Sequence, residues 1–247
     1  MRLTIVGCGD AFSSAGRLQT CFHVAADNRR FLIDCGATAL LGMERCGLDP
    51  GAVDTVFISH LHGDHFSGLI WWMLHAQHLL RRTSPLTIAG PPGIAQRFKV
   101  AAEALFPGCT ATPLRFEMAF VDYALAQSQT IGGIGVTPYE VRHPSGAPSC
   151  ALRLQAGGRT LAFSGDTEWA DTLPLAAGAA DLFMVECSTF ETPVPYHLSW
   201  RTLKDKLDVL GAKRYLLTHM GAETLRNRAA IADPRVALAE DGMVVDV

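Results

Sequence analysis

Four side chains that can bind a metal ion fall within six residues, in the segment His60-Leu61-His62-Gly63-Asp64-His65. Imidazole and carboxylate groups are suitable ligands for zinc and related first-row ions. The segment directly follows Thr55 to Ser59, an apolar run that predicts a strand. Ligands two residues apart at a strand end can converge on one ion, and we expect Gly63 to let the backbone turn so that Asp64 and His65 face a second one. Because there are too many ligands for one tetrahedral ion, the segment predicts two.

Three further ligand candidates each follow a predicted strand. They are His143, Asp166 and His219, after strands predicted to end at residues 141, 164 and 218. A carboxylate has two oxygens, so Asp166 can bridge two cations. Two metal ions about 3.5 to 4 Å apart can hold a hydroxide at neutral pH, because coordination lowers the pKa of water. Each residue alone could be an ordinary turn residue, but together with the histidine segment they predict a dinuclear metal site.

The elements that must position these residues alternate between strands and helices at both ends of the chain. Periodicity predicts strands over residues 3–6, 21–25, 30–34, 55–59, 86–89, 115–121, 134–141, 182–186 and 215–218, and a hairpin over 150–163 with its turn at Gly157-Gly158. Helices are predicted over residues 38–46, 67–81, 94–105 and 199–210. No linker rich in proline, serine or charge divides the chain. We therefore predict an α/β fold of two mixed β-sheets flanked by helices, in one domain over residues 1–247.

The chain resembles the metallo-β-lactamase superfamily. The resemblance rests on H-L-H-G-D-H after an apolar strand, an isolated histidine, G-D-T and T-H, and it runs from Gly7-Cys8-Gly9 and Asp34 through His219. It implies a four-layer αβ/βα sandwich with two divalent metal ions at one end of the sheets, Zn²⁺ by expectation, with Mn²⁺ or Fe²⁺ as alternatives. By this resemblance one ion would be held by His60, His62 and His143, the other by Asp64, His65 and His219, and Asp166 would bridge them.

Departures from other branches narrow the chemistry. Classical β-lactamase relatives commonly have a cysteine ligand where this chain has Asp166, and diiron oxidoreductase relatives usually have glutamate where it has His62. Instead, E-C-S-T-F at Glu186, followed by H-L-S at His197, is similar to the ribonuclease Z branch and related phosphodiesterases. In that branch a glutamate orients a histidine that assists cleavage of the phosphodiester. The resemblance thus implies catalytic roles for His197 and Glu186, and we add Asp64 to them.

Alternatives remain for several of these residues. His197 could instead cap or pack against the helix predicted from Ser199, and Cys187 is expected in the core. The tandem Trp71-Trp72 could form an apolar wall for a substrate or belong to the core. The same metals could also serve a thioester or lactone hydrolase, and a non-catalytic metal-binding protein would keep the ligands without an open coordination position. The remaining histidines, at positions 23, 75 and 78, are expected to be structural or surface residues.

The size and charge of the substrate follow from what the chain lacks. Relatives that process transfer RNA carry a long arm between the positions of His143 and the G-D-T motif, whereas here residues 144–165 leave no room for one. There is no basic run, and the formal net charge is -3. Two divalent ions would reverse the sign of that charge and concentrate it in one cleft. We predict a dinuclear hydrolase for a small anionic phosphodiester or cyclic nucleotide-like substrate, and no binding of long nucleic acid.

Composition sets the remaining expectations. With 49% hydrophobic and 18% charged residues the chain is globular, and its longest apolar stretch, Phe66 to Leu80, is too short to cross a membrane. Seven cysteines with no C-x-x-C pair indicate reduced thiols and a cytoplasmic protein. Relatives in the ribonuclease Z branch are often dimers, so a homodimer is also implied.

Overall fold

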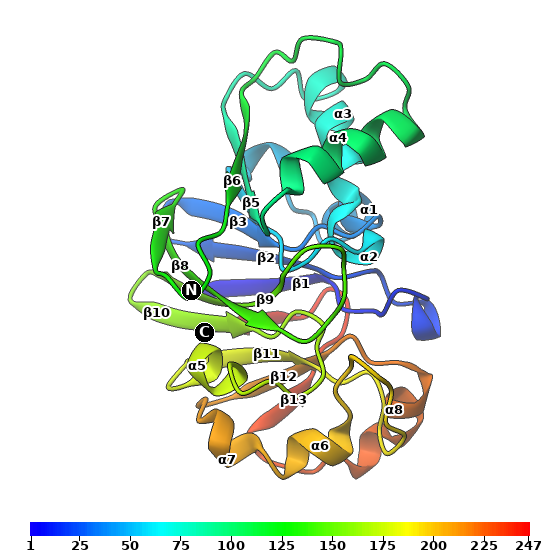
Figure 1. Ribbon diagram of the computed structural model, residues 1–247, viewed down its shortest axis with the longest axis vertical. Coiled ribbons are helices and arrows are strands. Elements are labelled where there is room, and N and C mark those ends of the chain that lie inside the picture. Colours follow the sequence, from blue (N-terminus) through cyan, green and yellow to red (C-terminus); the bar gives the residue numbers. More distant parts are fainter.

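A computed structural model describes residues 1–247 as two seven-stranded sheets that pack face to face (Figure 1). The strand order is β14-β1-β2-β3-β4-β5-β6 in the first sheet and β13-β12-β11-β10-β9-β8-β7 in the second. The strands are β1 (Arg2–Gly7), β2 (Cys21–Ala26), β3 (Arg29–Ile33), β4 (Thr55–Phe57), β5 (Leu86–Gly90), β6 (Met118–Asp122), β7 (Gln129–Ile131), β8 (Ile134–Val141), β9 (Ser149–Ala156), β10 (Arg159–Phe163), β11 (Leu182–Glu186), β12 (Tyr215–Thr218), β13 (Val236–Leu238) and β14 (Val244–Asp246). The helices are α1 (Ala39–Arg45), α2 (Gly63–Phe66), α3 (Gly68–His78), α4 (Ile94–Leu105), α5 (Leu173–Ala177), α6 (Trp200–Lys204), α7 (Leu207–Leu210) and α8 (Ala222–Asn227), with short 3₁₀ turns at η1 (Ser14–Gly16), η2 (Pro50–Ala52) and η3 (Arg228–Ala230).

Both sheets are mixed and follow the same plan. In the first, β14, β1, β2 and β3 pair antiparallel, and β3 to β6 are parallel. In the second, β7 to β10 pair antiparallel, and β10 to β13 are parallel. The last strand, β14, returns to the first sheet beside β1, so both termini lie in the middle of the molecule (Figure 1). Because parallel strands end at the same edge, each sheet offers several strand ends on which to place a site.

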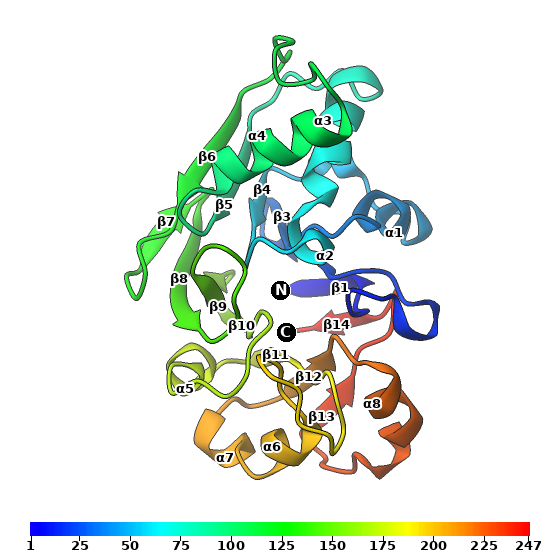
Figure 2. The same cartoon turned by 45° about the vertical axis from the view of Figure 1, so that its right-hand side comes forward.

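Three hydrophobic clusters separate the four layers. The central one has 24 buried residues and joins the two sheets, for example through the edge-to-face pair Phe22 and Phe163. A second cluster of 22 packs the first sheet against α1, α3 and α4, and a third of 20 packs the other sheet against α5, α6 and α7 (Figure 2). The predicted four-layer sandwich of two mixed sheets flanked by helices is confirmed.

The predicted elements differ from the observed ones at a few boundaries. The helix predicted over residues 199–210 is two short helices, α6 and α7, because the backbone at Lys206 departs from helical geometry, with φ of -116°. Its apolar residues still face the sheet and are buried. The helix predicted over 67–81 ends at His78, since Arg81 takes a left-handed φ of 49°. The predicted hairpin turn is confirmed, with positive φ at both Gly157 and Gly158.

None of these helices has the length and apolar character needed to cross a membrane.

Candidate metal centre

All seven predicted ligands lie where strands of both sheets end. The segment His60 to His65 follows β4 of the first sheet, whereas His143, Asp166 and His219 follow β8, β10 and β12 of the second. The ligand atoms form two groups, and within each group they all lie within 4.8 Å of one another. One group is His60, His62 and His143, and the other is Asp64, His65, Asp166 and His219. The fold therefore brings together the same two sets that the resemblance implies.

Asp166 lies between the two groups. Its Oδ1 is 3.3 Å from His65 Nε2, and its Oδ2 is 3.3 Å from His219 Nε2. The same Oδ2 is 3.9 Å from the Nε2 atoms of His60 and His143. Burial alone would raise the pKa of Asp166, but the nearby imidazoles of His219 and His65 outweigh it and hold the pKa well below its usual range. The side chain is thus an anion placed to contact ions on both sides.

Asp64 and His65 lie on α2, a single helical turn that begins directly after His62. This differs from the expectation that Gly63 makes the turn through its conformational freedom. Gly63 is the first residue of α2 and does not have a left-handed φ, and a Cβ there would meet nothing closer than Ser67 Oγ at 4.0 Å. The start of the helix itself turns Asp64 and His65 toward the second group, because successive residues of a helix project at different angles.

A buried carboxylate, Asp34, fixes which ring nitrogen two of the histidines present. His65 Nδ1 donates to Asp34 Oδ2 at 2.6 Å, which leaves Nε2 facing Asp166. The Ser59 hydroxyl donates to the same carboxylate at 2.7 Å, so its oxygen is free to accept from His60 Nδ1 at 3.0 Å. Both Nε2 atoms are buried without a hydrogen-bond partner. Histidine ligands are commonly oriented in this way through the nitrogen that does not bind the metal.

Some of the other polar atoms of the cluster have partners within it, and one carboxylate oxygen has none. His143 Nδ1 donates to the Tyr196 carbonyl at 3.0 Å, and its Nε2 points at His62 Nδ1, 2.9 Å away. Asp166 Oδ1 is buried with no hydrogen-bond partner. Buried polar atoms are rarely left unpaired. Unpaired imidazole nitrogens around an unpaired carboxylate oxygen are the donor set that zinc and related ions bind, so the residues fit divalent metal ions.

Sequence reasoning did not assign roles to Asp34, Ser59 and the Tyr196 carbonyl. Asp34 directly follows β3, and Ser59 lies two residues after the end of β4. Their position at the end of a strand was the sequence signal that could have indicated these roles. Asp34, Tyr196 and the predicted ligand His219 have positive φ angles of 56°, 66° and 53°. Such conformations are uncommon for residues other than glycine and concentrate at functional sites.

The pair of Glu186 and His197 lies against the cluster. His197 Nδ1 is 3.1 Å from Glu186 Oε2, and its ring stacks on that of His219 with an interplanar angle of 10°. Burial lowers the pKa of His197, but the hydrogen bond to Glu186 outweighs it and raises the pKa above its ordinary value. The glutamate itself is buried at the end of β11 and accepts from the Thr167 backbone N–H, next to Asp166. Glu186 therefore orients both His197 and the backbone next to Asp166.

The alternatives for the neighbouring residues are resolved by their surroundings. Ser199 caps α6 by accepting from the Thr202 N–H at 3.2 Å, so the predicted capping role belongs to Ser199 and not to His197. Cys187 is buried in the core as expected, and all seven cysteines are free. Trp72 is 1% exposed in the core under α3, and Trp71 packs edge-on against Phe106. Trp72 is thus part of the core, Trp71 is 38% exposed, and neither lines the cavity beside His143.

The fold and the sequence are similar to those of several known proteins. The metallo-β-lactamase fold protein YhfI from Bacillus subtilis superposes with a TM-score of 0.81, at 22% identity over 99% of this chain and 98% of that one. Human tRNase Z, short form, superposes with a TM-score of 0.80, at 24% identity over 100% and 99%. The ribonuclease Z of Haloferax volcanii is 27% identical over 100% of this chain and 95% of that enzyme.

The fold, the relatives and the His/Asp cluster define a metal-dependent hydrolase of the metallo-β-lactamase superfamily, in the branch of ribonuclease Z-like enzymes and phosphodiesterases. The predicted superfamily and enzyme class are confirmed. Within that branch the chain can be placed further. Its residues 1–244 match the family described as Anti-Pycsar protein Apyc1, and the chain belongs to that family.

Proposed function

We propose that this protein is a dinuclear phosphodiesterase that cleaves a small phosphodiester, such as a cyclic nucleotide. The observation that supports this most is the meeting of two ligand groups at Asp166, with the pair of Glu186 and His197 beside them. A phosphodiester in its transition state gathers negative charge both on its equatorial oxygens and on the leaving oxygen. Two cations and a protonated imidazole are placed to stabilise both.

The seven ligands would hold two divalent ions, with Asp166 shared between them. When bound, such ions would lower the pKa of a coordinated water and stabilise charge on the phosphoryl oxygens. Zn²⁺ suits the donor set best, since most of the ligand atoms are imidazole nitrogens, and Mn²⁺ or Fe²⁺ are alternatives. Asp64 would serve as both a ligand and a catalytic residue, and its Oδ2 lies 3.3 Å from the Nε2 atoms of His65 and His219.

His197 would act as the general acid. Its Nδ1 is held by Glu186, so the proton on Nε2 is the one available to a substrate. A ring nitrogen of His197 lies within 4.8 Å of the ligand atoms of His143 and Asp166, close to where a bound phosphoryl group would lie. When the bond from phosphorus to the leaving oxygen breaks, that oxygen would take the proton from His197. Glu186 favours the charged imidazole that this step needs.

A small substrate is supported by the space around the cluster. A cavity of about 430 Å³ opens beside His143 and Tyr196, with Arg142 and Glu168 on its border. Residues 144–165, where an arm for transfer RNA would be inserted, are a short loop and the hairpin of β9 and β10. The relatives named ribonuclease Z and tRNase Z act on RNA by their names, so discrimination against long RNA is the part of this proposal that needs a direct test.

The substrate class is tested with the purified, metal-loaded protein on a panel of compounds. We expect hydrolysis of bis(p-nitrophenyl) phosphate and of a 3′,5′-cyclic nucleotide, and none of a thioester or a lactone at comparable rates. Loss of diester activity in Asp166→Ala would support the shared ligand, and unchanged activity would rule out the dinuclear mechanism. Maturation of a precursor transfer RNA at rates matching the small diesters would overturn the proposed substrate size.

The role of His197 is tested by varying the leaving group. A cyclic nucleotide releases a poor alkoxide that needs a proton, whereas p-nitrophenolate leaves without one. His197→Ala should therefore lower kcat for the cyclic nucleotide by about 10² to 10⁴, and lower it much less for the p-nitrophenyl ester. His78→Ala, which removes an exposed imidazole on α3, is the matched control and should change neither rate. Equal losses on both substrates would show that His197 acts in some other way.

A further inference from the structure

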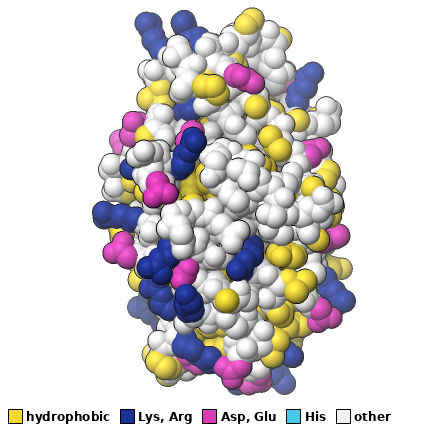
Figure 3. All heavy atoms as spheres, turned by 90° about the vertical axis from the view of Figure 1, so that its left-hand side faces the viewer, with side chains coloured by type: hydrophobic (Ala, Val, Ile, Leu, Met, Phe, Trp, Pro, Cys, Tyr) yellow, Lys and Arg dark blue, Asp and Glu magenta, His cyan; other side chains and the backbone are white.

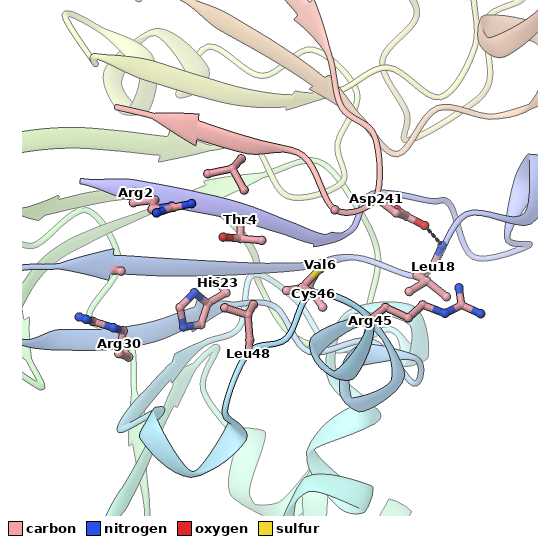
Figure 4. Close-up of a pocket in the computed structure, with 14 residues that line it drawn as sticks. Arg2, Thr4, Val6, Leu18, His23, Arg30, Arg45, Cys46, Leu48 and Asp241 are labelled. Atoms are coloured by element: carbon pink, nitrogen blue, oxygen red, sulfur yellow. Dashed lines mark hydrogen bonds between the residues drawn. The ribbon is translucent and has the colours of Figure 1, made fainter.

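A second cavity lies on the outer face of the first sheet, away from the metal centre. It measures about 780 Å³, and none of the seven metal ligands lines it (Figure 4). Its floor is the outward face of β1 and β2, where Thr4, Val6 and His23 alternate with residues that point into the core between the sheets. Helix α1 lies directly on one end of this face, since a Cβ at Gly42 would be 2.5 Å from the Val6 carbonyl. No helix covers the rest of this face, and the cavity lies there.

Two polar side chains at the bottom of the cavity have no partner in the protein. Thr4 and His23 stand opposite each other across β1 and β2, and they are only 7% and 6% exposed. Neither side chain forms a hydrogen bond with another protein group. Burial, together with the nearby Arg30 guanidinium, lowers the pKa of His23 to about 4, so the ring is neutral at pH 7. Neither the Thr4 hydroxyl nor the His23 ring is among the polar atoms that are closed off from solvent without a partner, so both face the open cavity and can bond to a ligand there.

The charge around the cavity is positive and unpaired. Arg2, Arg30 and Arg45 line it, and none of them forms an ion pair. The one carboxylate in the lining, Asp241, accepts from the Cys8 N–H at 3.0 Å and from the Leu18 N–H at 2.7 Å, so both of its oxygens are occupied. Arg30 is held in place by a hydrogen bond of 2.9 Å from its Nη1 to the Arg29 carbonyl.

Basic residues elsewhere on the molecule are arranged differently. Figure 3 shows Lys and Arg side chains spread over one face of the molecule, most densely in its lower half, and no histidine in view. Several basic residues at or near the start of strands pair with acids: Arg159 and Lys213 both contact Asp181, and Arg235 contacts Asp208 and Asp233. The three arginines of the cavity have no such partner.

We propose that this cavity binds a small phosphorylated molecule of the size of a nucleoside monophosphate. Its volume lies within the range of small-molecule sites, about 300 to 1,000 Å³. Arg2 and Arg30, which lie toward the same end of the cavity in Figure 4, would contact the phosphate, since guanidinium groups form strong charge-assisted hydrogen bonds with phosphate oxygens. Thr4 and His23 would donate to polar atoms on the floor. The apolar part of the lining, which includes Val6, Leu18, Leu48 and Val244, would cover an uncharged group such as a base.

Calorimetric titration of the metal-loaded protein with adenosine 5′-monophosphate tests the proposal without depending on turnover. The double variant R2A/R30A removes the two charges proposed to contact the phosphate and none from the metal centre. It should weaken binding about tenfold or more while leaving diester hydrolysis unchanged. The control R81A/K99A removes one exposed charge just after α3 and one on α4, and should bind like the wild type. Adenosine and inorganic phosphate should each bind more weakly than the monophosphate, which would show that both parts of the site are used.

Several results would overturn this assignment. Undetectable binding in the millimolar range would do so, and so would an affinity that R2A/R30A does not change, because the ligand would then be at the metal centre. Binding of hexaglutamate as tight as that of the nucleotide would assign the arginines to an acidic peptide. A change of oligomeric state in R2A/R30A, measured by light scattering, would assign the cavity to a contact between copies of the chain.

Discussion

At the scale of single residues, Asp34 shows how much of the metal centre depends on a side chain that touches no ion. Three donors converge on its buried carboxylate: His65 Nδ1 at 2.6 Å, the Ser59 N–H at 2.6 Å and the Ser59 hydroxyl at 2.7 Å. Through them it orients His65 directly and His60 by way of Ser59. A carboxylate has enough lone pairs to accept all three, whereas an amide has one acceptor oxygen.

We therefore predict that Asp34→Asn lowers metal affinity by about 10- to 100-fold, as is usual when a partner of a metal ligand is changed. Asparagine tolerates the left-handed backbone at this position, which keeps the fold. The affinity is measured by competition with a chromophoric zinc chelator. Asp27→Asn is the matched control, because Asp27 is exposed on a turn with a similar φ of 49°. Equal zinc affinities in both variants would show that Asp34 does not position the ligands.

At the scale of secondary structure elements, α2 carries two of the seven predicted metal ligands, Asp64 and His65, and α3 follows it directly. Helix α3 begins at Gly68, whose N–H donates to the Cys35 carbonyl at 2.9 Å, and a Cβ there would lie 2.1 Å from the Gly36 carbonyl oxygen. Backbone therefore touches backbone just beyond Asp34. The neighbouring Gly63 starts α2 with open space around it. There is thus no room for a side chain at Gly68 but ample room for one at Gly63, although the two glycines are only five positions apart in the sequence.

This contrast gives a paired prediction for stability. Gly68→Ala should lower the free energy of unfolding by about 3 kcal/mol, because neither backbone segment can move away from the new methyl group. Gly63→Ala should raise it by up to about 1 kcal/mol, since alanine suits a helix and meets no obstacle. Urea denaturation of both variants measures the difference. A Gly68→Ala protein as stable as the wild type would contradict the close packing of α3 on the loop after β3.

The same elements show what could be predicted from the sequence. His60 to His65, His143, Asp166 and His219 were found because each follows a strand with clear apolar periodicity, and this signal is local. The hydrogen bond between Asp34 and His65 was not predicted, because it joins side chains 31 residues apart that only the packed sheet brings together. The edge strands β7, β13 and β14 were missed because each has only three residues, and β14 pairs with β1 from the opposite end of the chain.

At the scale of the whole molecule, the metal centre connects the two sheets. His60 to His65 come from the first sheet, and His143, Asp166 and His219 come from the second. Without ions, the buried carboxylates of Asp34, Asp64 and Asp166 are balanced only by the protons of the imidazoles around them. Divalent ions would neutralise these carboxylates and would link the two sheets at the end where the strands terminate.

Metal binding should therefore stabilise the fold as a whole, since ions that bind only the folded state shift unfolding by mass action. At a free Zn²⁺ concentration of about 100 times Kd the gain is about 2.7 kcal/mol, or a rise in Tm of roughly 5 to 10 °C for a protein of this size. Calorimetry of chelated and zinc-reconstituted protein measures it. Asp166→Ala should lose most of the rise, because the shared ligand joins ions held by both sheets, whereas His78→Ala should keep it. If the chelated and reconstituted proteins melt together, the cluster does not hold the two sheets through metal ions.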